Sequence, residues 1–133
     1  MATEDTENTE MKKLNQVTEA IIGAAIEVHR ILGPGLREAT CEAALCIELK
    51  RRGIRHLRQP SILLTYKGES VGDYRIDVLV EDLVIVEIKS ADRFDPIFSA
   101  KLLTYLRSAS KKVGLLINFN TRFLKDGIRR YVL

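Results

Sequence analysis

Three charged residues stand inside segments that are otherwise apolar enough to be buried. Asp77 lies in one such segment, and Glu87 and Lys89 stand two residues apart in the next, within RIDVLVEDLVIVEIKS. Side chains alternate along a strand, so Glu87 and Lys89 are expected on the same face. A charge that is buried without a partner is costly. Something in the fold must therefore offset that cost.

A pair of carboxylates and a lysine could together bind a cation and a phosphate. A tight turn at Glu81-Asp82 would lay the two segments side by side and bring Asp77 close to Glu87. Two carboxylates forced together share a proton or bind a cation. Mg²⁺ prefers oxygen ligands and keeps several waters, so two carboxylates and a backbone carbonyl would suit it. Lys89 could then orient a metal-bound water or neutralise a phosphate, as in metal-assisted phosphodiester hydrolysis.

A plainer interpretation of the same residues stays open. An isolated E-x-K is common by chance, so Glu87 and Lys89 could lie past the edge of the sheet, solvated or paired with each other. Asp77 makes this less attractive, because it adds a second carboxylate at the place where the two segments would meet.

The hydrophobic pattern predicts one α/β domain, with a mixed central sheet and helices on both sides. Residues 1–13 are polar and acidic, and we expect a disordered tail ahead of a domain at 14–133. The segment 83–119 has the form of a βαβ unit, so its two strands should be parallel with a right-handed crossover. The expected order is α-α-β-β-β-α-β: helices from 14 to the GPG at 33–35, at about 36–52 and at about 96–109, and strands at 61–66, 71–80, 83–88 and 113–119. A last, short edge strand at 128–132 could follow this core.

Composition narrows the class of protein without deciding its function. The chain has 133 residues, a natural size for one domain, and a net charge of +3 that many proteins without a polyanion partner share. No apolar stretch approaches the ~20 residues of a membrane span, and we expect a cytoplasmic protein without a membrane partner. Cys41 and Cys46 point to different faces of one predicted helix, which favours neither a disulfide nor a zinc site.

The spacing and its surroundings resemble a known family. D-x(9)-E-x-K across a hairpin, preceded by a helix and followed by helix and strand, is similar to the PD-(D/E)XK nuclease superfamily, which implies a restriction-endonuclease-like core. More narrowly, the chain from 14 to 132 resembles the small prokaryotic GxxExxY proteins of that superfamily. The segments that carry this likeness are TEAIIGAAIEVHRILGPGL, YRIDVLVEDLVIVEIKS, LLTYL, GLLINFN and KDGI.

The resemblance implies a catalytic set and a metal ion. Asp77 and Glu87 would bind Mg²⁺ or Mn²⁺ with the backbone carbonyl of Ile88, and Lys89 would be the catalytic lysine. Glu38, which matches the glutamate of the GxxExxY motif, would help to hold the metal or its water. Its expected place in a first helical turn also favours a carboxylate on dipole grounds alone.

Three positions depart from the family pattern. Cys41 replaces the final tyrosine of the motif, Asp73 stands where glycine is common, and Lys101 stands where glutamine is usual. Lys101 and Tyr105 are one helical turn apart and can share a face, where Tyr105 would help to shape the site. Lys101 could contact a phosphate, or it could pair with a site carboxylate and displace the metal.

The remaining candidates are weaker. His29 lies beside an apolar stripe and is more simply a packed histidine than a catalytic base. The basic stretch KRRGIRHLR reads as a solvated helix end, with phosphate contact as the alternative. The aromatic residues are few and scattered, so no stacking platform for single strands is evident.

The sequence therefore predicts a metal-dependent nuclease that acts on nucleic acid, with DNA favoured over RNA. The protein could act alone, as a homodimer or with a partner protein. One alternative is a non-catalytic nucleic-acid-binding module that has kept the fold, which Lys101 and the basic stretch favour. Another is a protein-interaction subunit, which the small size of the domain favours. The sequence leaves open the strandedness of the substrate and whether cleavage is internal or from an end.

Overall fold

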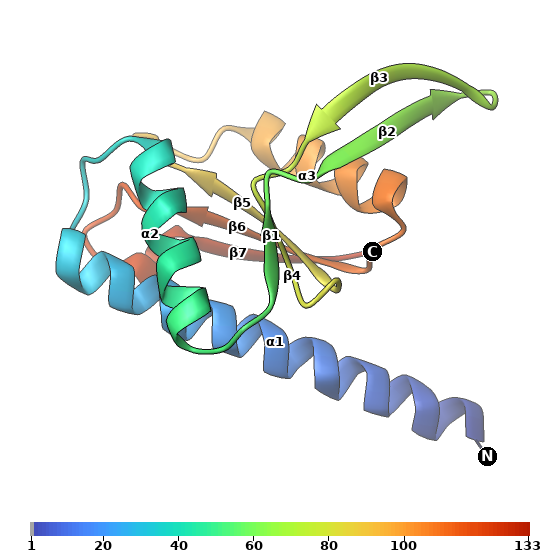
Figure 1. Cartoon of the computed structure of the whole chain (residues 1–133), viewed down its shortest axis with the longest axis horizontal. Coiled ribbons are helices and arrows are strands. Elements are labelled where there is room, and N and C mark those ends of the chain that lie inside the picture. Colours follow the sequence, from blue (N-terminus) through green and yellow to red (C-terminus); the bar gives the residue numbers. More distant parts are fainter. Residues whose placement is uncertain (1) are drawn as a thin grey trace.

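A five-stranded mixed sheet with helices on both faces forms the body of the protein (Figure 1). The structure is a computed structural model; it describes residues 2–133, with side chains from residue 8 onward. The predicted α/β architecture is confirmed. The elements are α1 (Ala2–Leu32), α2 (Glu38–Arg51), β1 (His56–Arg58), β2 (Ser61–Tyr66), β3 (Glu69–Arg75), β4 (Val78–Val80), β5 (Val84–Lys89), α3 (Pro96–Ala109), β6 (Val113–Asn118), the 3₁₀ helix η1 (Leu124–Gly127) and β7 (Ile128–Val132).

The strands of the main sheet run in the order β1-β4-β5-β6-β7. β5 and β6 are parallel, as the βαβ pattern predicts, and the other neighbouring pairs are antiparallel. The crossover helix α3 begins as expected, with the Asp95 carboxylate accepting the Ile97 N–H at 3.0 Å and Pro96 in the first turn.

Alternation along β5 divides the core into two parts. Val84, Val86 and Ile88 pack with α1 and α2 on one face of the sheet. Ile85 packs on the other face in a cluster that includes residues of α3. Glu87 and Lys89 share the parity of Ile85 along the strand, so they belong to the face that α3 covers. This is the arrangement that the sequence predicts for a central strand.

Helix α1 begins at Ala2, although the sequence predicts a disordered tail up to residue 13. Met11 lies three residues before Leu14, so it continues the apolar stripe of the helix, and it packs against the core. Glu10 forms an ion pair of 3.8 Å with Lys112. These tertiary contacts extend the helix into a segment whose polar composition alone suggests disorder.

The segment predicted as one strand at 71–80 is two strands in different sheets. β3 pairs with β2 in a two-stranded sheet that projects from the body, while β4 pairs with β1 and β5 (Figure 1). The chain passes from one sheet to the other at Ile76-Asp77. Opposite this point lies Pro60, directly before β2, and proline has no N–H to donate to a strand ladder. The short strand β1, within the basic stretch, was not predicted, because three residues show too little alternation.

The β2–β3 hairpin presents apolar side chains to solvent. Its turn residues Lys67 and Gly68 have φ of 51° and 84°, the two positive values that a type I′ turn requires. The side chains of Leu63, Tyr66, Val71 and Tyr74 are all exposed. The hairpin is anchored to the body by contacts between β2 and α3.

We expect Gly127→Ala to destabilise the fold, because a Cβ there would lie 2.1 Å from the backbone oxygen of Asn118, which cannot move freely. Overpacking of this kind should lower the free energy of unfolding, measured with urea, by about 1–3 kcal/mol. Gly23→Ala is the matched control, since its Cβ would meet only the end of the Arg52 side chain at 3.3 Å. That variant should keep or slightly gain stability, because alanine is the better helix former. Equal stabilities of the two variants would contradict this assignment.

Candidate active site

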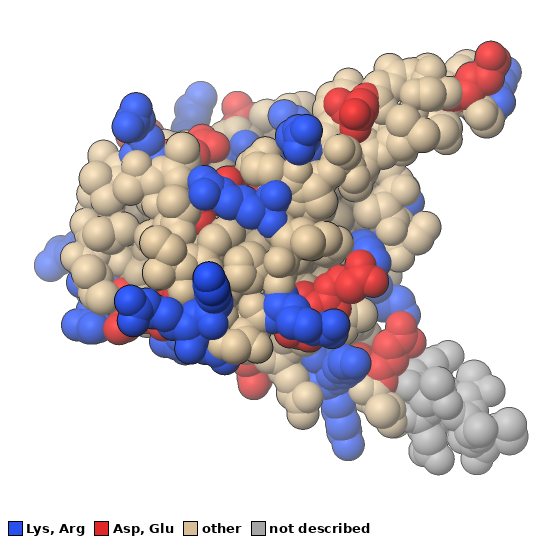
Figure 2. Space-filling view, in the orientation of Figure 1, with Lys and Arg blue, Asp and Glu red and all other residues tan. Residues whose placement is uncertain are grey.

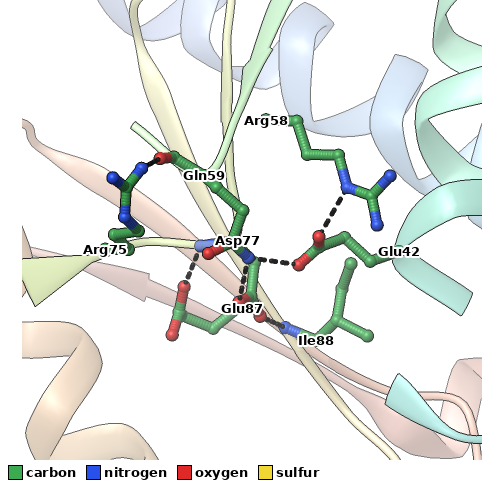
Figure 3. Close-up of polar contacts among 7 residues, drawn as sticks. All are labelled: Glu42, Arg58, Gln59, Arg75, Asp77, Glu87 and Ile88. Atoms are coloured by element: carbon green, nitrogen blue, oxygen red, sulfur yellow. Dashed lines mark hydrogen bonds and ion pairs between the residues drawn. The ribbon is translucent and has the colours of Figure 1, made fainter. Parts of the chain in front are cut away.

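Two crossed hydrogen bonds join Asp77 to strand β5 (Figure 3). The Asp77 N–H donates to Oε2 of Glu87 at 2.7 Å, and the Ile88 N–H donates to Oδ2 of Asp77 at 2.7 Å. The β4–β5 ladder ends at the pair Val78 and Val86, immediately before these residues. Carboxylate oxygens therefore replace backbone carbonyls as acceptors where the ladder stops, and the predicted proximity of Asp77 and Glu87 follows from this register.

Burial disfavours the ionised form of both carboxyl groups. It raises the pKa of Glu87 to about 7, and the negative charge of Asp77 acts in the same direction. Burial also raises the pKa of Asp77 to about 6, against the hydrogen bond from the Ile88 N–H, which favours the ionised form. The pair is thus poised to take up a proton near neutral pH or to accept a cation in its place.

Glu42 is the acidic residue of α2 that reaches this cluster, and sequence reasoning missed it. Its side chain is buried, and its carboxylate accepts from Nε of Arg58 at 2.6 Å and from Nε2 of Gln59 at 2.8 Å. The same Gln59 amide lies 3.3 Å from Oδ1 of Asp77 and so bridges the two acids (Figure 3). Glu42 shares the buried stripe of Leu45 and Leu49, and an acid on an apolar stripe is the signal that could have found it.

Lys89 lies on the same face of β5 as Glu87, one strand repeat further on. Its backbone is fixed because the carbonyl of Lys89 accepts the Phe119 N–H at 2.9 Å. Its Nζ lies 4.7 Å from the ring centroid of Phe98 at the start of α3, a distance suited to a cation–π contact. The ammonium group is therefore held on the α3 side of the sheet and is only partly buried.

Lys101 and Tyr105 of α3 are both coupled electrostatically to Glu87. Burial raises the pKa of Tyr105, and the charge of Glu87 raises it further. The positive charge of Lys101 acts to lower the pKa of Glu87. Lys101 is exposed, so its ammonium group remains accessible to a ligand.

Glu38 occupies a different place from the other predicted acids. It is exposed in the first turn of α2 and lines an open cavity of about 400 Å³ together with Arg37, Ser90 and Asn120. Ser90 directly follows Lys89, so this cavity borders the end of the strand that carries the site. The structure therefore brings Asp77, Glu87 and Lys89 together, while Glu38 stands beside a neighbouring hollow.

The remaining candidates of the sequence have structural roles. Nε2 of His29 lies 2.7 Å from the carbonyl oxygen of Thr121, and Cys41 is buried in the core. In the basic stretch, Arg52 pairs with Glu48 and Arg55 with Glu81. Figure 2 accordingly shows acidic side chains interspersed among the Lys and Arg residues of this face. The basic stretch is thus partly neutralised by its own neighbours.

The oxygens near Asp77 fit a hard cation with two carboxylates and a carbonyl. The carbonyl of Lys89 points toward β6, where it accepts the Phe119 N–H. Backbone groups alternate along a strand, so the N–H and carbonyl of Ile88 point to the opposite side, toward β4. The Ile88 N–H accordingly donates to Asp77. One oxygen of Glu87, Oε1, accepts no hydrogen bond from residues 8–133. Within the described chain no group of three or more His, Cys, Asp and Glu side chains could hold a metal ion. Further ligands would have to be backbone oxygens or waters, which Mg²⁺ accepts.

A family model for the PD-(D/E)XK nuclease superfamily matches residues 15–131. The chain belongs to the PD-(D/E)XK nuclease superfamily. Members of this superfamily typically use divalent metal ions, in line with the carboxylate pair. The match includes every residue of the D…E-x-K set and the whole main sheet except the final residue of β7.

The other comparisons add little to this assignment. No curated protein matches the sequence significantly. The crystal structure titled as that of SSO0001 is similar to this PD-(D/E)XK chain with a TM-score of 0.47 and 22% identity, over 70% of this chain and 47% of that one. The chain therefore spans about half the length of that protein. No helix in residues 2–133 is long and apolar enough to cross a membrane.

We expect Glu87→Gln to stabilise the metal-free protein at high pH and not at low pH. Glu87 has a pKa of about 7 when folded and an ordinary value of 4.5. A raised carboxyl pKa contributes stability below pH 4.5 that is lost as the pH rises through about 7. Above that pH, wild type should be less stable than the neutral variant by on the order of 3 kcal/mol.

Urea unfolding between pH 4 and 8 with a chelator present measures this difference. Glu69→Gln, at an exposed position of the β2–β3 hairpin, is the control and should show no such pH-dependent gain. A stability difference between Glu87→Gln and wild type that stays constant over this range would show that Glu87 is not held in the buried position described.

Proposed function

We propose that this protein is a divalent-metal-dependent nuclease that hydrolyses phosphodiester bonds in nucleic acid, with DNA as the favoured substrate. The observation that carries the proposal is the crossed pair of Asp77 and Glu87, with Lys89 on the same strand face as Glu87. Such a set is expensive to bury unless a cation and a phosphate complete it. Membership of the PD-(D/E)XK superfamily supports the same class of reaction.

Each residue of the candidate site has its own role in this proposal. Asp77, Glu87 and the backbone carbonyl of Ile88 hold Mg²⁺ or Mn²⁺, which when bound lowers the pKa of water and neutralises phosphate charge. Lys89 positions the attacking water and stabilises the charge that develops on the phosphate. Gln59 fixes the Asp77 carboxylate through the 3.3 Å contact, and the buried Glu42 fixes Gln59 in turn.

Three finer points belong to the same proposal. The GPGLREATC segment supports placement among the GxxExxY proteins, with Glu38 acting from its neighbouring cavity on the metal or its water. Tyr105 shapes the site from α3, and Lys101 contacts a phosphate of the substrate. Cleavage of both strands of a duplex needs two sites, which a homodimer or a partner protein would provide.

One observation favours a second candidate, a nucleic-acid-binding module without catalysis. The positive charge of Lys101 favours the ionised form of Glu87, so it supplies part of the compensation that a metal ion would otherwise give. A protein of this kind would bind nucleic acid with a steep salt dependence and without a need for metal. Removal of Lys89 would then leave no catalytic deficit to measure.

Metal affinity should depend on the two crossed acids. In the double variant Asp77→Ala/Glu87→Ala, we expect binding of Mg²⁺ or Mn²⁺ by calorimetry to be lost, because both carboxylates that hold the metal directly are removed. Glu69→Ala/Asp73→Ala removes two exposed carboxylates from the β2–β3 hairpin and is the matched control. The metal site is elsewhere if the first variant binds metal as tightly as wild type does.

Cleavage should require both the metal and Lys89. Labelled single- and double-stranded DNA and RNA are incubated with Mg²⁺, Mn²⁺ or EDTA, and the wild type should cut at least one of them only with metal. Lys89→Ala should reduce the rate by about 100-fold or more, as the loss of a single electrostatic stabiliser does. Lys67→Ala, at the exposed tip of the hairpin, is the control and should leave the rate unchanged.

The results separate the two candidate functions. Metal-dependent cutting that persists in Lys89→Ala would refute the role of the lysine. Tight nucleic-acid binding with no cutting by the wild type would favour the binding module instead.

A further inference from the structure

A cavity with two aromatic walls opens between the β2–β3 hairpin and α3. Its volume is about 300 Å³. The hairpin contributes Leu64 and Tyr74 to its lining, and α3 contributes Ile97, Lys101 and Tyr105. The lining is thus apolar and aromatic with one cation, a combination that the sequence does not reveal because the two tyrosines lie far apart in the chain.

The ring of Tyr74 is placed by the strand beneath it. The centroids of Tyr74 and Tyr105 are 6.3 Å apart with their planes tilted by 41°, and the side chain of Tyr74 is 44% exposed. A Cβ at Gly72 would lie 2.5 Å from Cε2 of Tyr74, so the ring rests where the glycine has no side chain. The glycine therefore lets the ring lie against the strand, with much of its surface open to a ligand.

The cavity adjoins the candidate active site. Tyr105 packs in the same cluster as Ile85, which lies two residues before Glu87 on the same face of β5. Lys101 lies one turn before Tyr105 on α3, and both residues line the cavity. The cavity therefore lies on the α3 side of the sheet, which is the side to which Glu87 belongs.

We propose that this cavity binds one unpaired nucleobase of a DNA strand whose neighbouring phosphodiester lies at Asp77 and Glu87. The base stacks on Tyr74, and Lys101 pairs with an adjacent phosphate. The inference rests on the proposed function, because a base arrives only if the site receives nucleic acid. A paired base would first have to be unpaired and unstacked, which costs free energy that an unpaired base does not pay. The cavity is at the small end of ligand pockets, which suits a single base.

The inference deepens the proposed function by naming a class of substrate. Strands with unpaired segments, such as single strands, flaps or overhangs, can deliver a base to the cavity without the cost of unpairing that a continuous duplex would pay. Stacking on an aromatic ring is tolerant of sequence, since every base has a π face. The protein is therefore expected to prefer single-stranded over double-stranded DNA, without a preference for a particular base.

The test measures binding alone, on the full chain, with EDTA present to prevent cleavage. Fluorescence anisotropy measures the affinity of the protein for three kinds of labelled DNA. These are an oligothymidylate, a set of the same strands that each lack one base at a different position, and a duplex of equal length. Tyr74→Leu removes the stacking ring but keeps an apolar side chain. Tyr66→Leu removes a tyrosine that is more exposed than Tyr74 from the same hairpin outside the cavity, and is the control.

We expect Tyr74→Leu to weaken single-strand binding by about 5- to 100-fold, and Tyr66→Leu to leave it unchanged. An abasic site at one position should weaken wild type by a similar factor and should have no further effect on Tyr74→Leu. Tyr74→Phe should bind as wild type does. Gly72→Ala, which displaces the ring without removing it, should show a smaller loss, and circular dichroism checks that each variant is folded.

Several results would overturn the inference. Unchanged single-strand affinity in Tyr74→Leu, an equal loss in Tyr66→Leu, or an equal loss of duplex affinity would each refute the base-binding role of the cavity. Absence of single-strand binding by the wild type would do the same. Because the readout is binding without metal, failure of the cavity leaves metal-dependent cleavage intact, and failure of cleavage leaves this test unaffected.

Discussion

The structure depends on the exchange of hydrogen bonds between Asp77 and β5. The β4–β5 ladder stops at Val78 and Val86, and two carboxylates then accept the N–H groups that would otherwise seek carbonyls. This exchange satisfies the backbone while leaving two acidic side chains close together in a poorly solvated place. Their carboxyl groups consequently have raised pKa values, and a bound cation would favour their ionised forms.

The rest of the fold supports this one junction. Because the ladder ends at Asp77, the chain is free to leave the main sheet there, and the β2–β3 hairpin projects from the body with β2 in contact with α3 (Figure 1). The α1–α2 side holds Asp77 through Gln59 and the buried Glu42. On the α3 side, Lys101, Tyr105 and the hairpin's Tyr74 line one cavity. One face thus fixes the acids, and the other offers surfaces to a ligand.

Residues adjacent across a hairpin or along one element were predictable, whereas residues joined by tertiary packing were not. The turn at Glu81-Asp82 and the parity of β5 were enough to bring Asp77 to Glu87. The position of Glu42 was not predicted, because it depends on how α2 packs over β1 and β5. The same holds for Met11, whose packing extends α1 into a polar segment, and for the approach of Tyr74 to Tyr105. Local periodicity can place Glu42 and Met11 on a buried helix face, but it does not show which residues they contact.

The most direct test of the central claim is an NMR titration of the carboxyl groups with and without Mg²⁺. In a chelator, the carboxyl of Glu87 should titrate near pH 7, where burial and Asp77 place its pKa. Saturating Mg²⁺ should shift this titration to markedly lower pH, because a bound cation favours the ionised form. Glu69 serves as the exposed reference in the same spectra. If Glu87 titrates near pH 7 with and without Mg²⁺, the acids do not hold the metal and the account of the site is wrong.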